Sequence, residues 1–270
     1  MDTGGARVTP AALGLFGEAL AWLADPAHWA GAGGIPNRVL QHLGVTAFAL
    51  VIAAVVALPA GVLIGHTRRG TALVGGLTGA ARALPTLGLL TLFGLAFGIG
   101  LTAPLLALVV LAIPSLLAGA YAGVQAIDPA VPAAAQAVGF SPAQVILRVE
   151  LPLSLPVMVG GIRAAVLQLV STATLAAYTA DLGLGRYLFS GLKSRDYAQM
   201  LAGALLVITL TLVLEVLLAA CQRAATARFG RPGSRVRRRA SRSRAATAPT
   251  LPTPDATHPA SPAQREEVRS

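Results

Sequence analysis

The chain has 270 residues, of which 55% are hydrophobic and only 12% are charged. Soluble globular domains carry roughly 25% charged residues, so this composition excludes an ordinary soluble protein. The formal net charge of +10 is unevenly placed, because 11 of the 21 basic residues follow position 222. The basic character therefore belongs to the C-terminal end and says little about the apolar part.

Residues 1–41 are predicted to form an N-terminal segment at a membrane surface. The stretch 10–24, PAALGLFGEALAWLA, is shorter than the roughly 20 residues that a helix needs to span a bilayer. Its Leu, Phe and Trp side chains with a single Glu suit a helix lying in the interface; an additional crossing is the alternative. No cleavable leader is predicted, because MDTGGARVTP lacks a basic stretch followed directly by an apolar core.

Residues 42–222 are predicted to form a membrane domain with five transmembrane helices. The apolar runs long enough to cross a bilayer are 42–65, 71–97, 102–124, 153–179 and 198–222. The second contains a break at Leu84–Pro85, and the third contains Pro114. In lipid only helices and closed barrels satisfy the backbone, and these runs do not alternate as barrel strands do. The predicted fold class is therefore all-α, a polytopic helical membrane protein.

Basic residues orient the spans through the positive-inside rule. Arg68 and Arg69 place the first loop in the cytoplasm, and the Arg-rich C-terminus agrees. With five spans, 129–150 is then cytoplasmic and the polar loop 181–196 lies outside. The tail 223–270 has too few large apolar residues to fold. It is predicted to be a disordered anchor held against anionic lipid; nucleic-acid binding and phosphorylation are the less favoured alternatives.

The cytoplasmic segment 129–150 is predicted to form a helix–turn–helix between two spans. Three alanines at 133–135 give a smooth face that another surface can approach closely, and Gly139 permits a turn. Ser141 followed by Pro142 suits the start of the second helix. Such an element can contact a soluble partner, although an ordinary loop helix is the alternative.

The run AAAQAVGFSPAQVILRVELPLSLP (133–156) resembles the cytoplasmic coupling loop of bacterial ATP-binding-cassette importer permeases. The matching positions are Ala134, Ala135, Gly139, Val149, Leu151 and Pro152. In that family the loop docks in a cleft of the ATPase subunit, and the resemblance implies this role for these residues and for Arg148. The family pattern begins with Glu where this chain has Ala133, which removes a charged contact.

Two further stretches, ALPTLGLL (83–90) and STATLAAYTADLGLGRYLFSGL (171–192), look like the osmoprotectant branch of that family. That branch imports glycine betaine, choline, carnitine and related quaternary amines. The resemblance covers about residues 40–222 and implies the type I importer permease fold. Its implied partners are cytoplasmic ATPase subunits, a second permease subunit (identical or paralogous) and an extracytoplasmic solute-binding protein, with no cofactor. An importer of methionine, phosphonate or taurine is the alternative.

ATP hydrolysis is expected on another chain, because the sequence contains no phosphate-binding GxxxxGK[ST] loop. The nearest stretch, 191–194, reads GLKS and lacks the Gly–Lys pair.

An intramembrane protease is disfavoured because a nucleophile and base at one depth are not found, and His42 and His66 are expected at the interface rather than on a metal. A scaffold without a transport role is the remaining rival. The single Cys221 excludes an intrachain disulfide.

Three ionisable residues lie inside predicted spans. A charged residue in a membrane span is costly and is therefore expected to have a function. Counted from the cytoplasmic ends at about 1.5 Å per residue, Arg82 lies roughly 16 Å deep, Arg163 roughly 13 Å and Glu215 roughly 12 Å. Glu215 is therefore predicted to pair with Arg163 or Arg82 near an inner gate. Separate snorkelling of each charge to water is the alternative.

Ser171, Thr174 and Tyr178 are candidates for the transport path, because their spacing places them on one helix face. Hydrogen bonding between helices is the alternative role for such residues. Tight recognition of a quaternary ammonium uses an aromatic cage, and with 5% aromatic residues, none clustered, this chain offers none. High-affinity recognition is therefore expected in the binding protein.

Overall fold

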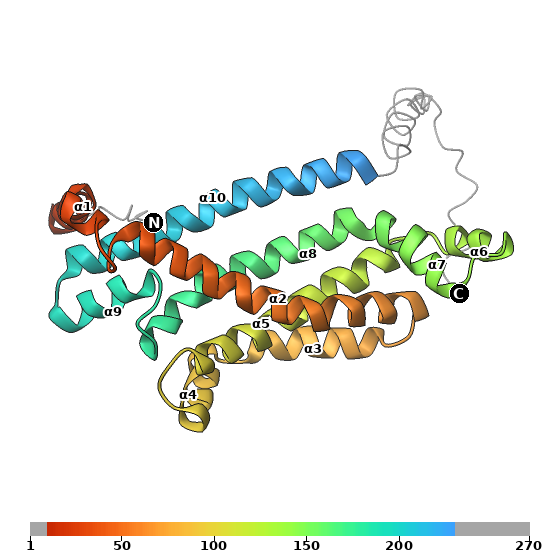
Figure 1. The fold of residues 1–270 in the computed structure, drawn as a ribbon, viewed down its shortest axis with the longest axis horizontal. Coiled ribbons are helices and arrows are strands. Elements are labelled where there is room, and N and C mark those ends of the chain that lie inside the picture. The colour runs from red at the N-terminus through yellow and green to blue at the C-terminus, as the bar shows by residue number, and fades with distance from the viewer. Residues whose placement is uncertain (1–9, 230–270) are drawn as a thin grey trace, which may run out of the picture. The chain divides into compact units, whose positions relative to one another are not determined.

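The computed structural model of the chain describes residues 10–229, which all belong to one compact unit (Figure 1). Residues 1–9 and 230–270, and a few side chains within the helices, that of Arg82 among them, lie outside this description. Every regular element among the described residues is a helix, which confirms the all-α prediction. Helices suit so apolar a chain because each satisfies its own backbone hydrogen bonds without water.

Among residues 10–229, four helices are long and apolar enough to cross a bilayer. They are α2 (Ile35–Thr67), α5 (Thr102–Gln125), α8 (Leu151–Thr172) and α10 (Tyr197–Phe229). α5 packs against both α2 and α8, and α10 packs against α8 (Figure 1). The largest group of buried apolar side chains joins α2, α5 and α8 through residues such as Ala53, Leu116 and Leu169.

The second of the five expected spans, 71–97, is not one continuous helix. It is divided into α3 (Thr71–Ala83) and α4 (Thr86–Phe97), and α4 turns away from the line of α3 (Figure 1). The break follows from Pro85, since proline has no N–H to donate and disfavours the helical conformation of the residue before it. Leu84 is accordingly extended, with φ −69° and ψ 119°. The predicted position of the break is confirmed, and the region 71–97 forms two helices.

Two helices extend beyond the predicted limits of the membrane domain. α2 begins at Ile35, with Pro36 in its first turn, and α10 continues to Phe229. Residues 223–229, which the sequence assigned to a disordered tail, are therefore helical, and the rest of that tail lies outside the described residues. The difference arises because the predicted limits followed apolar runs, whereas a helix also continues through good helix formers such as Arg and Ala.

Shorter helices precede and interrupt the long ones. They are α1 (Pro10–Ala24), which confirms the predicted helix, the 3-10 turns η1 (Pro26–Trp29) and η3 (Ala173–Tyr178), and α9 (Gly185–Ser194). The sequence assigned α9 to a polar loop. It is helical because its apolar face is buried against η3 and α10 through Tyr187 and Gly191, while Lys193 stays exposed.

Glycines allow α2, α5 and α8 to approach one another closely. A Cβ added to Gly61 of α2 would lie 2.7 Å from the Cβ of Ala120 on α5. A Cβ added to Gly119 of α5 would lie 2.6 Å from the Cα of Gly161 on α8. Small residues at such crossings let helix backbones pack directly, which stabilises helix pairs in lipid.

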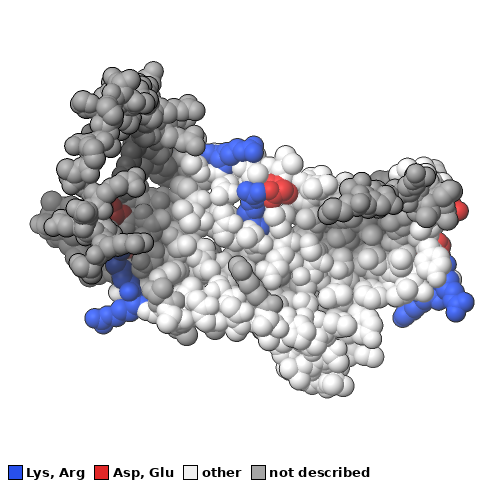
Figure 2. Space-filling view, turned by 180° about the vertical axis from the view of Figure 1, so that it is seen from behind, with Lys and Arg blue, Asp and Glu red and all other residues white. Residues whose placement is uncertain are grey.

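Charged side chains gather toward the two ends of the visible surface, with one small group between them among uncharged residues (Figure 2). The last turn of α2, the segment containing α6 (Ala130–Ala137) and the C-terminal end of α10 lie together at one end, here called the α6 end (Figure 1). α1 and α9 lie at the other, the α9 end. The chain direction thus places the basic residues Arg68 and Arg223 at the same end.

Candidate functional site

Segment 126–150 joins α5 to α8 at the α6 end and has the predicted helix–turn–helix form. After α6 come α7 (Pro142–Val145) and a widened π-helical turn, η2 (Ile146–Glu150). Gly139 makes the turn between α6 and α7 with φ +93°, a left-handed conformation that favours glycine. Ser141 caps α7 as predicted: the Gln144 N–H donates to its hydroxyl, and the Ser141 N–H donates to the Gln144 side chain.

The outer face of this segment is apolar and open. Ala134 is exposed and Ala135 half-buried, and the larger side chains Val138 and Leu147 are 77% and 63% exposed. Arg148 is also exposed, and no described residue accepts a hydrogen bond from it. Solvent-facing apolar side chains gathered beside a free cation are typical of a surface that binds another protein.

Leu151 and Pro152 have a different position from the rest of the predicted coupling residues. Both are half-buried in the first turn of α8, which continues directly from η2. Val145 is fully buried and holds α7 against the bundle. The predicted coupling residues thus divide into an exposed face and a base that fixes the segment to α8.

Three hydrogen bonds attach the segment and the last residue of α5 to residues 65–68 at the end of α2. The Gln125 side chain donates to the Gly65 carbonyl at 3.1 Å, and Arg68 donates to the Ile127 carbonyl at 3.0 Å. The third joins His66 Nδ1 to Glu150 Oε2 at 2.8 Å. The role of Glu150 was not predicted, although an acidic residue directly before an apolar span was a usable signal.

Arg163 of α8 and Glu215 of α10 form the ion pair that counting depths along the spans predicted. Arg163 Nε donates to Glu215 Oε2 at 2.8 Å, and a second guanidinium nitrogen donates to Glu215 Oε1. The third nitrogen donates to the Gln222 side chain at 2.9 Å. Two parallel bonds to one carboxylate fix both side chains geometrically. The side chain of Arg82, the other predicted partner, lies outside the described part of the chain.

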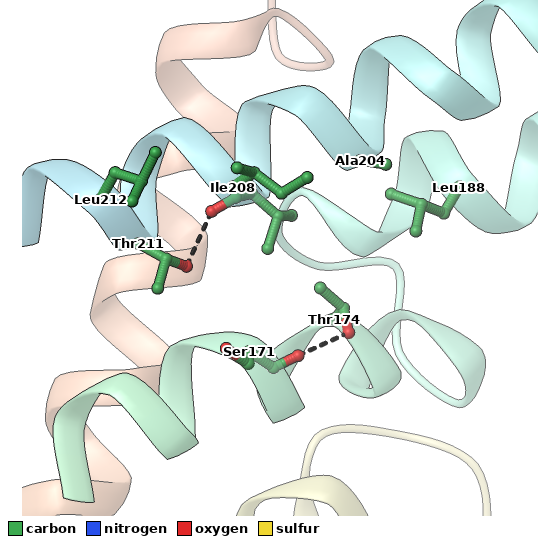
Figure 3. A pocket seen from close by; sticks show the side chains of 8 residues that line it. Ser171, Thr174, Leu188, Ala204, Ile208, Thr211 and Leu212 are labelled. Atoms are coloured by element: carbon green, nitrogen blue, oxygen red, sulfur yellow. Dashed lines mark hydrogen bonds between the residues drawn. The ribbon is translucent and has the colours of Figure 1, made fainter. Parts of the chain in front are cut away.

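A pocket of about 400 Å³ opens between α8, α9 and α10 (Figure 3). Its lining is Ser171, Thr174, Leu188, Ala204, Val207, Ile208, Thr211 and Leu212. The structure therefore brings two predicted path residues, Ser171 and Thr174, into one cavity. The α10 residues were missed, although Thr211 was a detectable hydroxyl within an apolar helix.

The hydroxyl groups in the pocket act as acceptors toward its interior. Thr174 donates its hydrogen to the Ser171 carbonyl, and Thr211 donates to the Val207 carbonyl, each at 2.8 Å (Figure 3). Their oxygen lone pairs stay available, and the remaining walls are aliphatic. Such a lining accommodates methyl groups and offers weak acceptors to polarised C–H groups.

Tyr178, the third predicted path residue, does not line the pocket. It is 63% exposed and stacks edge-on against Phe189, with ring centroids 5.6 Å apart. The prediction assumed an α-helix, in which residues four apart are neighbours. The chain instead forms the 3-10 turn η3 over Ala173–Tyr178. At three residues per turn instead of 3.6, Tyr178 is rotated away from the face of Ser171 and Thr174.

His42 lies buried at the α9 end, near the start of α2. Its Nε2 lies 2.9 Å from the Val170 carbonyl on α8, and the Leu184 N–H donates to its Nδ1 at 3.4 Å. A carbonyl only accepts, so these partners assign the hydrogen to Nε2. These contacts could not be predicted from the local sequence, because they come from segments more than 100 residues away.

Three charged residues form a cluster at the α9 end. Arg38 pairs with Asp181 at 3.1 Å, and Arg186 pairs with the same carboxylate oxygen at 3.1 Å. The Tyr187 hydroxyl donates to the Gly33 carbonyl at 2.6 Å. Burial raises the pKa of Tyr187, and the nearby positive charge of Arg38 opposes that rise. This cluster fastens the start of α2 to the loop before α9.

Comparison with known families supports one assignment. The family described as "Binding-protein-dependent transport system inner membrane component" matches residues 39–227. The choline transport system permease protein OpuBB of Bacillus subtilis is 29% identical over 72% of this chain and 89% of its own length. The osmoprotectant import permease protein OsmW of Salmonella typhimurium is 31% identical over 69% of this chain and 89% of its own length.

Solved structures share the fold. A chain of the MetNI methionine ABC transporter, in an inward-facing conformation, aligns with a TM-score of 0.61 and 25% identity. The alignment covers 69% of this chain and 94% of that chain. A chain of an amino acid ABC transporter aligns with a TM-score of 0.55 and 19% identity, over 70% of this chain and 93% of the other.

Proposed function

Because this chain belongs to the family of binding-protein-dependent transport system inner membrane components, we propose that it is the permease subunit of an ATP-binding-cassette importer for quaternary-ammonium osmoprotectants. The observation that carries the proposal is an exposed apolar segment at one end of a bundle of span-length helices. A permease without such a segment has no surface through which a separate motor can act on it.

The proposed solutes are choline, glycine betaine and carnitine, the compounds named for the relatives. The pocket chemistry supports this class, because aliphatic walls and acceptor oxygens suit a trimethylammonium group better than an anion. The pocket lining includes no carboxylate or aromatic ring, which suits a low-affinity passage. Methionine is the competing solute suggested by the MetNI likeness, at lower sequence identity than OsmW.

ATP is hydrolysed, in this proposal, by separate cytoplasmic subunits that bind the exposed face of 126–150. Basic residues at the α6 end, including Arg68 and Arg223, favour the cytoplasmic side for that end and for the C-terminus. The α9 end then faces outward, where the charged cluster around Asp181 is available to a solute-binding protein. A second permease subunit completes the path. In this arrangement the chain is a transporter subunit and performs no chemical step itself.

We also propose that the transport domain extends over α2 to α10, wider at each end than 42–222. The segment before it, containing α1, packs against α10, which suits a peripheral support. The Arg-rich region that follows position 229 is proposed as a lipid-facing anchor, as its composition indicates.

The test is uptake of labelled solutes by bacterial cells that lack their own osmoprotectant importers. The cells express this chain together with its ATPase and binding-protein partners, and the control cells lack this chain alone. We expect uptake of at least one quaternary amine, competed by the others, and none of methionine. Uptake of methionine alone would assign the alternative solute class, and failure to bind any ATPase would overturn the importer function.

A further inference from the structure

Glu150 is a buried carboxylate placed where the cytoplasmic segment meets α8. The residue is 4% exposed, and its partner is His66 Nδ1 at 2.8 Å, from the last turn of α2. The His66 side chain is 18% exposed. A buried carboxylate requires a hydrogen-bond partner, so these two side chains hold each other in place.

The other end of the segment is fastened to the same turn of α2. Arg68 donates to the Ile127 carbonyl, and Gln125 donates to the Gly65 carbonyl. α2 and α5 are closely packed at this point, since a Cβ on Gly65 would lie 2.7 Å from the Cβ of Val124. The start and the end of the segment therefore converge on residues 65–68, the end of α2 and its C-cap.

The two fastenings differ in what they connect. The one at the start of the segment reinforces α2 and α5, which already pack along their length through Gly61 and Gly65. The one at the end joins α2 to the chain entering α8. At the opposite end of the bundle, α2 contacts α8 again through His42 and the Val170 carbonyl. Two histidines of one helix thus tie its two ends to the beginning and end of α8.

We propose that the His66–Glu150 contact is a positioning contact that transmits displacement of the cytoplasmic segment to α2 and α8 together. The inference rests on the proposed function and specifies how force from the ATPase reaches the pocket. A push on the exposed face reaches Glu150 through the wide turn η2. Because α8 carries Ser171 beside Val170, a shift of α8 along α2 changes the pocket lining at its far end.

The test uses the whole importer, with its ATPase and binding protein, in lipid vesicles, and measures ATP hydrolysis and uptake in the same sample. Glu150→Ala and His66→Ala remove the contact, and His66→Asn keeps a donor near the position of Nδ1. Thr67→Ala, an exposed position directly beside His66 that has no part in the coupling face, is the matched control for changes at the end of α2.

We expect Glu150→Ala and His66→Ala to lower solute uptake per ATP hydrolysed by about tenfold, with hydrolysis little changed. His66→Asn should retain most of the wild-type ratio. If uptake and hydrolysis fall in proportion, the contact merely supports the fold and the proposal is overturned. The same conclusion follows if uptake falls only because less complex is recovered. Failure of the importer function itself is distinguishable, because the wild-type vesicles would then take up no solute.

Discussion

Arg163 and Glu215 join α8 to α10 through two parallel hydrogen bonds inside the apolar body of the bundle. Each side chain is about one-third exposed, at 31% and 32%. Gln222 accepts from the remaining guanidinium nitrogen, and its amide nitrogen would lie 2.8 Å from a Cβ added to Gly160. The pair, the amide and the glycine together set how closely α10 lies on α8.

Exchanging the two charges tests whether this pair acts as a unit. Arg163→Glu or Glu215→Arg alone places two like charges together, and we expect each to lower uptake by about tenfold. The double exchange should recover most of the lost uptake, because opposite charges again face each other, with their positions exchanged. The measurement is a double-mutant cycle on uptake, with Arg223→Gln on the exposed face of α10 as control. Additive losses would show that the two residues act separately.

Leu147→Asn tests the exposed face of the cytoplasmic segment. Leu147 is 63% exposed, so the change should alter the free energy of unfolding by no more than about 0.5 kcal/mol. We expect binding of the ATPase subunits to weaken by about tenfold or more, because an apolar contact at a protein interface is lost. The measurement is co-purification of the ATPase with the permease. Leu192→Asn, a change of similar exposure on α9, is the control; equal recovery of the ATPase with both variants would contradict the prediction.

Ala204→Phe tests the pocket between α8, α9 and α10. Ala204 lines the cavity, and a phenyl ring there should fill much of its volume. We expect uptake to fall by about tenfold or more, with ATPase binding unchanged, because the large side chain competes for the solute's space. Ala220→Phe, at an exposed position on the same helix, is the control. Normal uptake by the Ala204 variant would exclude this pocket from the path.

Gly161→Ala tests the crossing of α5 and α8. The new Cβ would lie 2.5 Å from the Cα of Gly119, so the two backbones must move apart. We expect a loss of about 1–3 kcal/mol in the free energy of unfolding, measured by chemical denaturation in detergent micelles. Gly94→Ala in α4 is the control, because no atom lies within 4 Å of its added Cβ. There alanine should be neutral or stabilise by up to about 1 kcal/mol. Equal effects at both positions would refute close packing at the crossing.

Much of the fold could be predicted because the helices are marked by long apolar runs. Pro85 even located the division of α3 from α4, since the effect of proline on the backbone is local. α9 and the outer turns of α2 and α10 were missed because their polar residues conceal helices that tertiary contacts stabilise. Tyr187, buried in α9 and bonded to Gly33, illustrates this.

The candidate site could be predicted only where the position of a residue along its own helix or turn was enough information. Equal depths predicted the pairing of Arg163 with Glu215, and a local glycine predicted the turn at position 139. The contacts of His42 and His66 could not be predicted in this way, since they depend on which helix faces α2 and at what rotation. Tyr178 failed for a related reason, because a change from α to 3-10 geometry leaves little trace in the sequence.

The wide turn at residues 146–150 determines the angular setting of α8. A π-helical turn bonds each N–H five residues back instead of four, so it accommodates one residue more than the α-helix around it. If the same residues formed a regular α-helical turn instead, the extra residue would rotate the preceding helix relative to α8 by about 100°. Arg163 and Ser171 meet their neighbours only at the present angle. The rotation of α8 about its own axis thus depends on a single backbone turn that ends at Glu150.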